Sequence, residues 1–273
     1  MRKKLLISAI FLSITSTAFP ADITEQEIAN NMLTMYSSEK YLDEQMDKYG
    51  LSGEKRQIVK DYTKWILTRP EFVNRAAKIM KQVGGNNLKS MSKNAYQTGL
   101  AIGYSLLDEL VSKGTSKVPV SDQRIIYKYQ IKLLEAASPQ YCKKLLLGPK
   151  DNKFLMETIP TNRIMYKKLS VSEVREMTRA LKKSVEAALN DNISEKIVHP
   201  TELEIANKAF ENIWIENCKK LSKSKCEKLI ETATNQNGAS DEELCQAGIF
   251  TVKSIYSLDD LLFTALITNS VQN

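Results

Sequence analysis

The residue types that most often carry acid–base or nucleophilic chemistry are sparse in this sequence, which contains one histidine. His199 precedes Pro200 and Thr201, just before a stretch with helical spacing. A catalytic imidazole would need a serine or cysteine placed beside it by the fold, and the chain has no Gly-x-Ser-x-Gly turn to present such a serine. We therefore interpret His199 as a loop residue that fixes the start of a helix, and the catalytic residues stay unknown.

Motifs for metal and phosphate binding are equally scarce. The sequence has no His-Glu-x-x-His pair and no calcium-loop pattern, and Gly84-Gly85 lacks the further glycine and lysine of a phosphate loop. We therefore expect no metal and no cofactor. Carboxylates are plentiful, and Glu109 and Glu135 lie beside apolar stripes. Because an acid pair of the kind that cleaves glycans depends on its separation in space, a carboxylate-dependent hydrolase of glycans or lipids stays open as an alternative.

The four cysteines are the strongest covalent signal, at Cys142, Cys218, Cys226 and Cys245. An even number in an oxidising compartment predicts two disulfides. Cys218–Cys226 with Cys142–Cys245 would clip a helical corner and tie the halves together, and Cys142–Cys218 with Cys226–Cys245 fits the spacing about as well. The absence of Cys-x-x-Cys and the single histidine argue against a redox pair or a zinc site.

Residues 1–21 have the three parts of a secretory signal peptide: basic residues at positions 2–4, an apolar run from Leu5 to Ile14, and small residues ending at Ala18 or Ala21. The apolar run is about half the length of roughly 20 residues that a membrane-spanning helix needs. No cysteine lies near the cleavage zone to accept a lipid. We expect an exported, soluble mature chain in a bacterial periplasm that is not a lipoprotein and has no transmembrane span.

The charge balance argues against a nucleic-acid partner. The net charge of +7 falls to +4, with 36 basic and 32 acidic residues, once residues 1–21 are removed. Lysine greatly outnumbers arginine and the lysines are scattered, unlike the basic stripe of a nucleic-acid binder. Scattered lysines are typical of a solvated surface.

Helical signals dominate the mature chain. Several serines and threonines are followed three residues later by an acid, the spacing of a capping box, at Thr24/Glu27, Ser170/Glu173, Thr201/Glu204, Ser224/Glu227, Ser240/Glu243 and Ser257/Asp260. Apolar residues recur at three- and four-residue steps, and strand-like alternation is scarce. The sequence predicts an all-α, bundle-like globular fold with helices near 24–36, 38–48, 54–68, 71–83, 88–112, 122–136, 139–147, 171–190, 202–220, 225–234, 241–254 and 258–268.

Two features bear on organisation. The uncharged run from Ala95 to Leu107 predicts a buried central helix, and Gly114 is expected to stop it. Proline and Asp-Asn signals in 148–161 predict an irregular linker between an N-terminal half, 22–147, and a C-terminal half, 162–273, although the two may pack as one domain. Apolar residues in such a loop can form a partner-binding patch, which makes Phe154, Leu155 and Met156 candidate binding residues.

These observations favour a binding protein without catalysis of its own. We expect a protein partner in the cell envelope, and the concrete hypothesis is an inhibitor, such as an immunity protein, that neutralises a secreted toxin or hydrolase. A rigid, cross-linked helical scaffold with little catalytic chemistry suits that role. The alternatives are an envelope assembly or stress factor with chaperone-like binding and, from another class, the carboxylate-dependent hydrolase.

Overall fold

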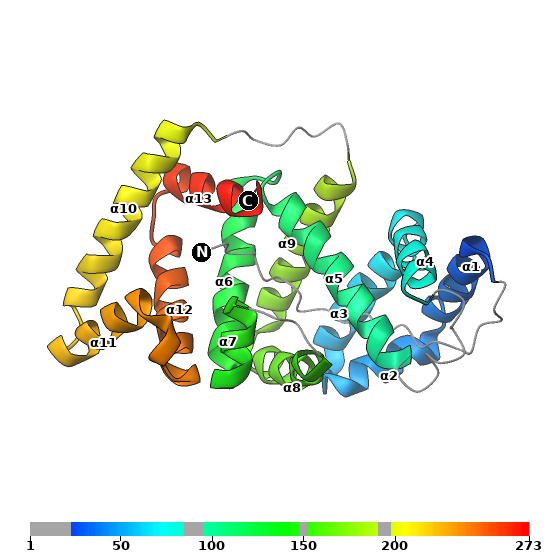
Figure 1. Ribbon diagram of the computed structural model, residues 1–273. Coiled ribbons are helices and arrows are strands. Elements are labelled where there is room, and N and C mark those ends of the chain that lie inside the picture. Colours follow the sequence, from blue (N-terminus) through cyan, green and yellow to red (C-terminus); the bar gives the residue numbers. More distant parts are fainter. Residues whose placement is uncertain (1–22, 85–94, 148–151, 191–197, 273) are drawn as a thin grey trace. The chain divides into compact units, whose positions relative to one another are not determined.

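The computed structural model describes residues 23–84, 95–147, 152–190 and 198–272. Every regular element in these residues is helical, which confirms the predicted all-α fold (Figure 1). The expected signal peptide, residues 1–21, lies outside the described residues. The α-helices are α1 (Glu25–Tyr36), α2 (Glu39–Lys48), α3 (Gly53–Leu67), α4 (Pro70–Gly84), α5 (Ala95–Thr115), α6 (Val120–Ala136), α7 (Pro139–Leu147), α8 (Asn152–Lys168), α9 (Val171–Leu189), α10 (Pro200–Lys219), α11 (Lys223–Thr234), α12 (Asp241–Tyr256) and α13 (Asp260–Gln272), with a short 3-10 turn, η3 (Gln236–Gly238).

Three of the predicted capping boxes form. In each, the Ser or Thr hydroxyl accepts from the backbone N–H of the acid, and the carboxylate accepts from the backbone N–H of the cap, at Thr24/Glu27, Ser170/Glu173 and Ser240/Glu243. The other predicted pairs do not start helices. In α13, for example, the capping oxygen belongs to Asp259, whose carboxylate accepts from the Leu262 N–H at 3.0 Å. Where Ser and Asp residues lie close together in the sequence, more than one of them can cap a helix. The packing of the helix determines which residue does so.

The expectation of irregular structure through 148–161 is wrong from residue 152 onward, because α8 occupies that stretch with Pro160 inside it. A proline inside a helix removes one N–H donor and crowds the carbonyl four residues earlier, which is why the sequence indicated a break. Tertiary burial outweighs that penalty. The second half of α8 packs into the core through Thr158, Thr161, Asn162, Met165 and Tyr166.

Gly114 does not end its helix as expected, since α5 continues to Thr115. The predicted burial of this helix is confirmed in the part whose side chains are described. Its apolar face is covered at Ile102, Leu106, Leu107, Leu110 and Val111.

The chain forms two compact units made of non-contiguous segments, which differs from a division into successive halves. In the described residues, unit 1 contains 111–147, 183–190 and 198–272, and unit 2 contains 23–84, 95–110 and 152–182. Unit 2 has an aromatic and aliphatic core. Its fully buried large side chains include Tyr36, Tyr166, Phe72, Ile28 and Leu42.

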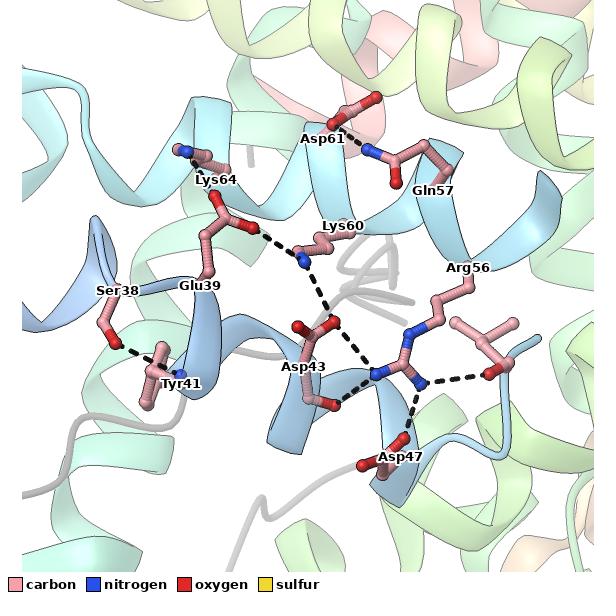
Figure 2. A network of polar contacts seen from close by, with 11 residues as sticks. Ser38, Glu39, Tyr41, Asp43, Asp47, Arg56, Gln57, Lys60, Asp61 and Lys64 are labelled. Carbon is pink, nitrogen blue, oxygen red and sulfur yellow. Dashed lines mark hydrogen bonds and ion pairs between the residues drawn. The ribbon is translucent and has the colours of Figure 1, made fainter. Parts of the chain in front are cut away.

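Within unit 2, α2 and α3 are joined by alternating ion pairs (Figure 2). Glu39, Asp43 and Asp47 repeat every four residues along α2, so they share one helix face. Lys60 bridges Glu39 at 2.7 Å and Asp43 at 2.9 Å, and Arg56 contacts Asp43 at 3.0 Å. These cations lower the pKa of the Glu39 and Asp43 carboxyls. The acids of α2 therefore serve helix pairing.

Unit 1 is organised around α6, which is buried on several sides and packs against α7, α12 and α13. Arg124 ties α6 to the turn between α12 and α13. Its guanidinium donates to the carbonyls of Tyr256 at 2.8 Å and Leu258 at 2.6 Å, and it lies over the Phe263 ring. This cation closes a turn whose carbonyls would otherwise need water.

Candidate functional site

The residues first considered for catalysis have structural roles. His199 is exposed at the N-cap of α10, where its backbone N–H donates to the Glu202 carboxylate at 3.3 Å. This confirms its expected place at the start of a helix. Glu109 is within 3.9 Å of Arg75, and the Glu135 carboxylate lies 2.6 Å from the Lys253 ammonium. The fold thus uses both acids in surface ion pairs.

Every resolved shift of a carboxyl pKa in the described residues is a lowering of that pKa. A general acid of a hydrolase needs a raised pKa, whereas the pKa values of Glu27, Glu39, Asp43 and Glu243 are lowered by hydrogen bonds and nearby cations. Among the described residues, no three His, Cys, Asp or Glu side chains are grouped as metal ligands. The described part of the chain therefore offers no observation in favour of the carboxylate hydrolase.

The four cysteines form two disulfides, and one of the two favoured pairings is the observed one. Cys142–Cys245 joins α7 to α12, and Cys218–Cys226 joins the end of α10 to the start of α11. The first closes a long loop and fixes two helices that already pack on each other. The second closes a short loop and holds a helical corner.

Phe154, Leu155 and Met156 lie in the first turn and a half of α8, so they belong to a helix and not to the predicted loop. Their side chains are outside the described part of the structure. Their role in partner binding stays a prediction.

The most exposed apolar surface of unit 1 lies on α10 and α11. We call the segment of α10 and α11 (Figure 1), residues 200–234, the clipped hairpin, because the Cys218–Cys226 disulfide closes the corner between these helices. In α10 only Ala206 and Cys218 are fully buried. Four of the seven large apolar side chains that are exposed in the described residues belong to the clipped hairpin: Ile205 (55%), Ile215 (47%), Leu221 (38%) and Ile230 (46%).

The helical spacing of α10 determines which of its side chains are exposed to solvent. At 100° per residue, Ile215 falls opposite Ala206 and Ile205 falls opposite Trp214, with Asn212 between the two isoleucines. The opposite face is held by Trp214, whose ring meets the Phe250 ring of α12 edge to face at 5.1 Å and whose indole N–H donates to Thr251 Oγ1. Trp214 is half-buried. Because the Trp214 face of α10 packs against α12, the two isoleucines are exposed to solvent.

A groove of about 340 Å³ runs between α11 and α12. Its apolar lining comes from Leu221, Leu229 and Phe250. Its polar lining residues, which we call its rim, are Lys225, Lys228 and Thr232 on α11 and Glu243 and Gln246 on α12. A concave site of this size, with both apolar and polar lining groups, can receive a side chain of a partner or a small ligand.

The clipped corner is strongly basic. Five exposed lysines fall within ten residues of chain, at Lys219, Lys220, Lys223, Lys225 and Lys228. Lys228 pairs with Glu243 at 2.6 Å, whereas Lys219 and Lys225 have no ion pair among the described residues. The Lys228 ammonium and the Ser240 cap lower the Glu243 pKa to about 2. The corner therefore keeps uncompensated positive charge beside an apolar groove.

This surface was not predicted from the sequence, although two sequence features indicate it. The lysines between Cys218 and Cys226 depart from an even scatter, and the apolar stripe of α10 shifts after Ile213 to Trp214, leaving Ile215 outside. No local pattern in the sequence indicates the groove, because two of its lining residues, Gln246 and Phe250, lie on α12 and come from a separate part of the chain.

Comparisons with known proteins add no assignment. No family model matches the chain, and no curated protein or solved structure is similar enough to carry a fold or a function over to it. In the described residues, none of the helices has the length and hydropathy required to cross a bilayer.

Proposed function

We propose that the protein is an exported, periplasmic protein-binding module that contacts an envelope partner through the clipped hairpin. The observation that carries this proposal is that four of the seven exposed large apolar side chains of the described residues belong to the clipped hairpin, whose corner is closed by a disulfide. Apolar side chains gathered at one place on a surface are typical of protein contacts. The disulfide limits the motion of the corner, which lowers the ordering cost of association.

The concrete form of the proposal is an inhibitor, such as an immunity protein, of a secreted toxin or hydrolase. An inhibitor needs a rigid surface and no chemistry of its own, and the acids and the histidine discussed above are used in caps and ion pairs. An envelope assembly or stress factor is the second candidate, because exposed apolar side chains also suit weak binding of unfolded clients. The two candidates differ in affinity and stoichiometry.

The test is cross-linked capture of the chain, expressed with residues 1–21 and a C-terminal tag in its native cell. We would compare the wild type with Ile215→Asp, and with Ile164→Asp as a control, because Ile164 is equally exposed (45%) but lies on α8. One dominant partner that is lost with Ile215→Asp and kept with Ile164→Asp supports the inhibitor. Circular dichroism checks that both variants stay folded.

Other outcomes decide against the inhibitor. A diffuse set of clients, all weakened by Ile215→Asp, favours the assembly factor. A partner that both variants retain equally contradicts the assignment of the clipped hairpin. Absence of any protein partner contradicts the proposal as a whole and directs attention to glycan and lipid substrates.

A further inference from the structure

The groove between α11 and α12 has the parts of an anchor site for one side of an amphipathic segment. Leu221 and Leu229 supply aliphatic walls, and the Phe250 ring supplies an aromatic surface held in place by Trp214. Buried apolar anchors that fill such pockets dominate the energetics of many interfaces. The volume of about 340 Å³ accommodates one or two large apolar side chains.

The charged side chains at the rim indicate which kind of group in a partner would lie beside its apolar anchor. The Lys228–Glu243 pair spans the groove from α11 to α12 and is internally neutral. Lys225 lies on the same rim without an ion pair among the described residues. Lys219, Lys220 and Lys223 add positive charge beyond the groove; of these only Lys223 has an ion pair, with Glu227 at 4.0 Å, and on the groove side Glu231 and Glu242 act on Lys228. A carboxylate next to the anchor would therefore meet a complementary potential.

We propose that this groove receives an acidic amphipathic segment of a partner protein, with a large apolar side chain inserted against Phe250 and a neighbouring carboxylate paired with Lys225. This inference rests on the proposed protein-binding function and names the chemistry of the partner. The mixed lining, in which Thr232, Glu243 and Gln246 alternate with apolar groups, suits a peptide with polar and apolar sides better than an acyl chain.

The Cys218–Cys226 disulfide holds the rim. Leu221 and Lys225 both lie between the two cysteines, in the short loop that the disulfide closes. Fixing them before the partner arrives reduces the entropy lost on binding. Reduction of this bond is expected to weaken binding at the groove.

The experiment uses a phage-displayed library of short random peptides, selected on the oxidised full mature chain. We expect enriched peptides in which an aromatic or long aliphatic residue lies within one helical turn of Asp or Glu. Labelled copies of these peptides are then titrated by fluorescence anisotropy. Leu221→Ala and Lys225→Glu should each weaken binding by about tenfold, which corresponds to about 1.4 kcal/mol.

Matched controls separate the groove from general attraction to a basic protein. Ile164→Ala removes a similarly exposed aliphatic side chain from α8, away from the groove, and Lys40→Glu makes the same charge change on α2. Both should leave the affinity within about twofold of the wild type, as distant surface changes usually do. Leu221 and Lys225 are exposed, and thermal unfolding checks that their variants stay folded.

Several results overturn the inference. They are enriched peptides without an acid, affinities insensitive to Leu221→Ala and Lys225→Glu, and a library that yields no binder. Binding to phosphatidylglycerol vesicles that Lys225→Glu abolishes, with no peptide binding, would assign the corner to an anionic membrane surface instead. If the captured envelope partner depends on Ile215 but not on Leu221 or Lys225, the groove inference fails while the protein-binding function stands.

Discussion

At the scale of single residues, Gly114 shows how backbone contact constrains sequence. A Cβ at this position would lie 1.7 Å from the Ser184 carbonyl oxygen. The Ser184 hydroxyl is within 2.8 Å of the Val111 carbonyl, to which it donates, and 3.1 Å from the Thr115 hydroxyl. The end of α5 and this turn of α9 therefore meet with no room for a side chain.

We expect Gly114→Ala to lower the free energy of unfolding by about 2–3 kcal/mol, the range of overpacking in a tight contact. The clash is with backbone, so no side chain can rotate away to relieve it. Gly248→Ala should cost less, because its Cβ would meet the terminal Leu146 Cδ1, which can move. Gly238→Ala, with nothing within 4 Å, is the control. Urea denaturation measures all three, and equal losses for Gly114→Ala and Gly238→Ala would contradict the packing argument.

Glu243 gives the clearest pH dependence. Its folded-state pKa of about 2 is below the ordinary value of 4.5, so the folded state favours the carboxylate. The stability it contributes is complete above about pH 4.5 and disappears as the pH falls toward 2. Glu243→Gln keeps the capping spacing but loses the charge pair with Lys228, since glutamine also fits a capping box.

We therefore expect the wild type to be more stable than Glu243→Gln at pH 6, and the difference to vanish near pH 2. Denaturation curves at several pH values measure this difference. Glu211→Gln is the control, because Glu211 is exposed and makes no ion pair among the described residues. A wild-type advantage that stays constant from pH 6 to 2 would show that Glu243 does not act through its charge.

At the scale of elements, the two disulfides differ in what they constrain. Cys142–Cys245 spans 103 residues and joins α7 to α12, whereas Cys218–Cys226 spans 8 residues. In the chain-entropy account, a cross-link stabilises the folded state more when it closes a longer loop. The long link therefore supports unit 1, and the short link shapes the clipped hairpin.

Replacing Cys142 and Cys245 with serine should lower the free energy of unfolding by roughly 4–5 kcal/mol, and replacing Cys218 and Cys226 by roughly 2–3 kcal/mol. The second double variant should keep its helical content but lose affinity for the peptides selected on the groove. Denaturation under oxidising conditions and anisotropy titration measure the two effects. A larger stability loss at Cys218–Cys226 would reverse these assigned roles.

The α2–α3 ion pairs contribute at the same scale. Lys60 forms ion pairs with two acids of α2 and its side chain is largely covered, so Lys60→Met removes two links between the helices (Figure 2). We expect a modest loss of stability that shrinks in high salt, because salt screens the wild-type pairs but has nothing to screen in the variant. Thermal unfolding at low and high salt measures the loss. A loss that is independent of salt would assign the contribution to packing of the lysine stem.

At the scale of the whole molecule, the predicted export and the two disulfides can be tested together. Among the described residues all four cysteines are in disulfides and no thiol is free. The expected cleavage after Ala18 or Ala21 would give a mature chain that begins at Phe19 or Asp22. Intact mass spectrometry of the exported protein should show one of these starts together with two disulfides. Retention of residues 1–21, or detection of free thiols, would contradict an exported and oxidised protein.

Local sequence signals determined the helical class, most helix bounds and the presence of disulfides. Helix bonds join residues four apart and caps act over three, so spacing within a short segment suffices. Even at this scale, Pro160 led to a wrong prediction of irregular structure, because its local cost to the helix is outweighed by the burial of Asn162 and Tyr166. Only the tertiary structure decided which cysteines pair, why Gly114 must be glycine and where a groove forms beside Lys225. These features arise from contacts between residues far apart in the chain, such as Cys142 with Cys245 and Trp214 with Phe250, for which short-range spacing carries no signal.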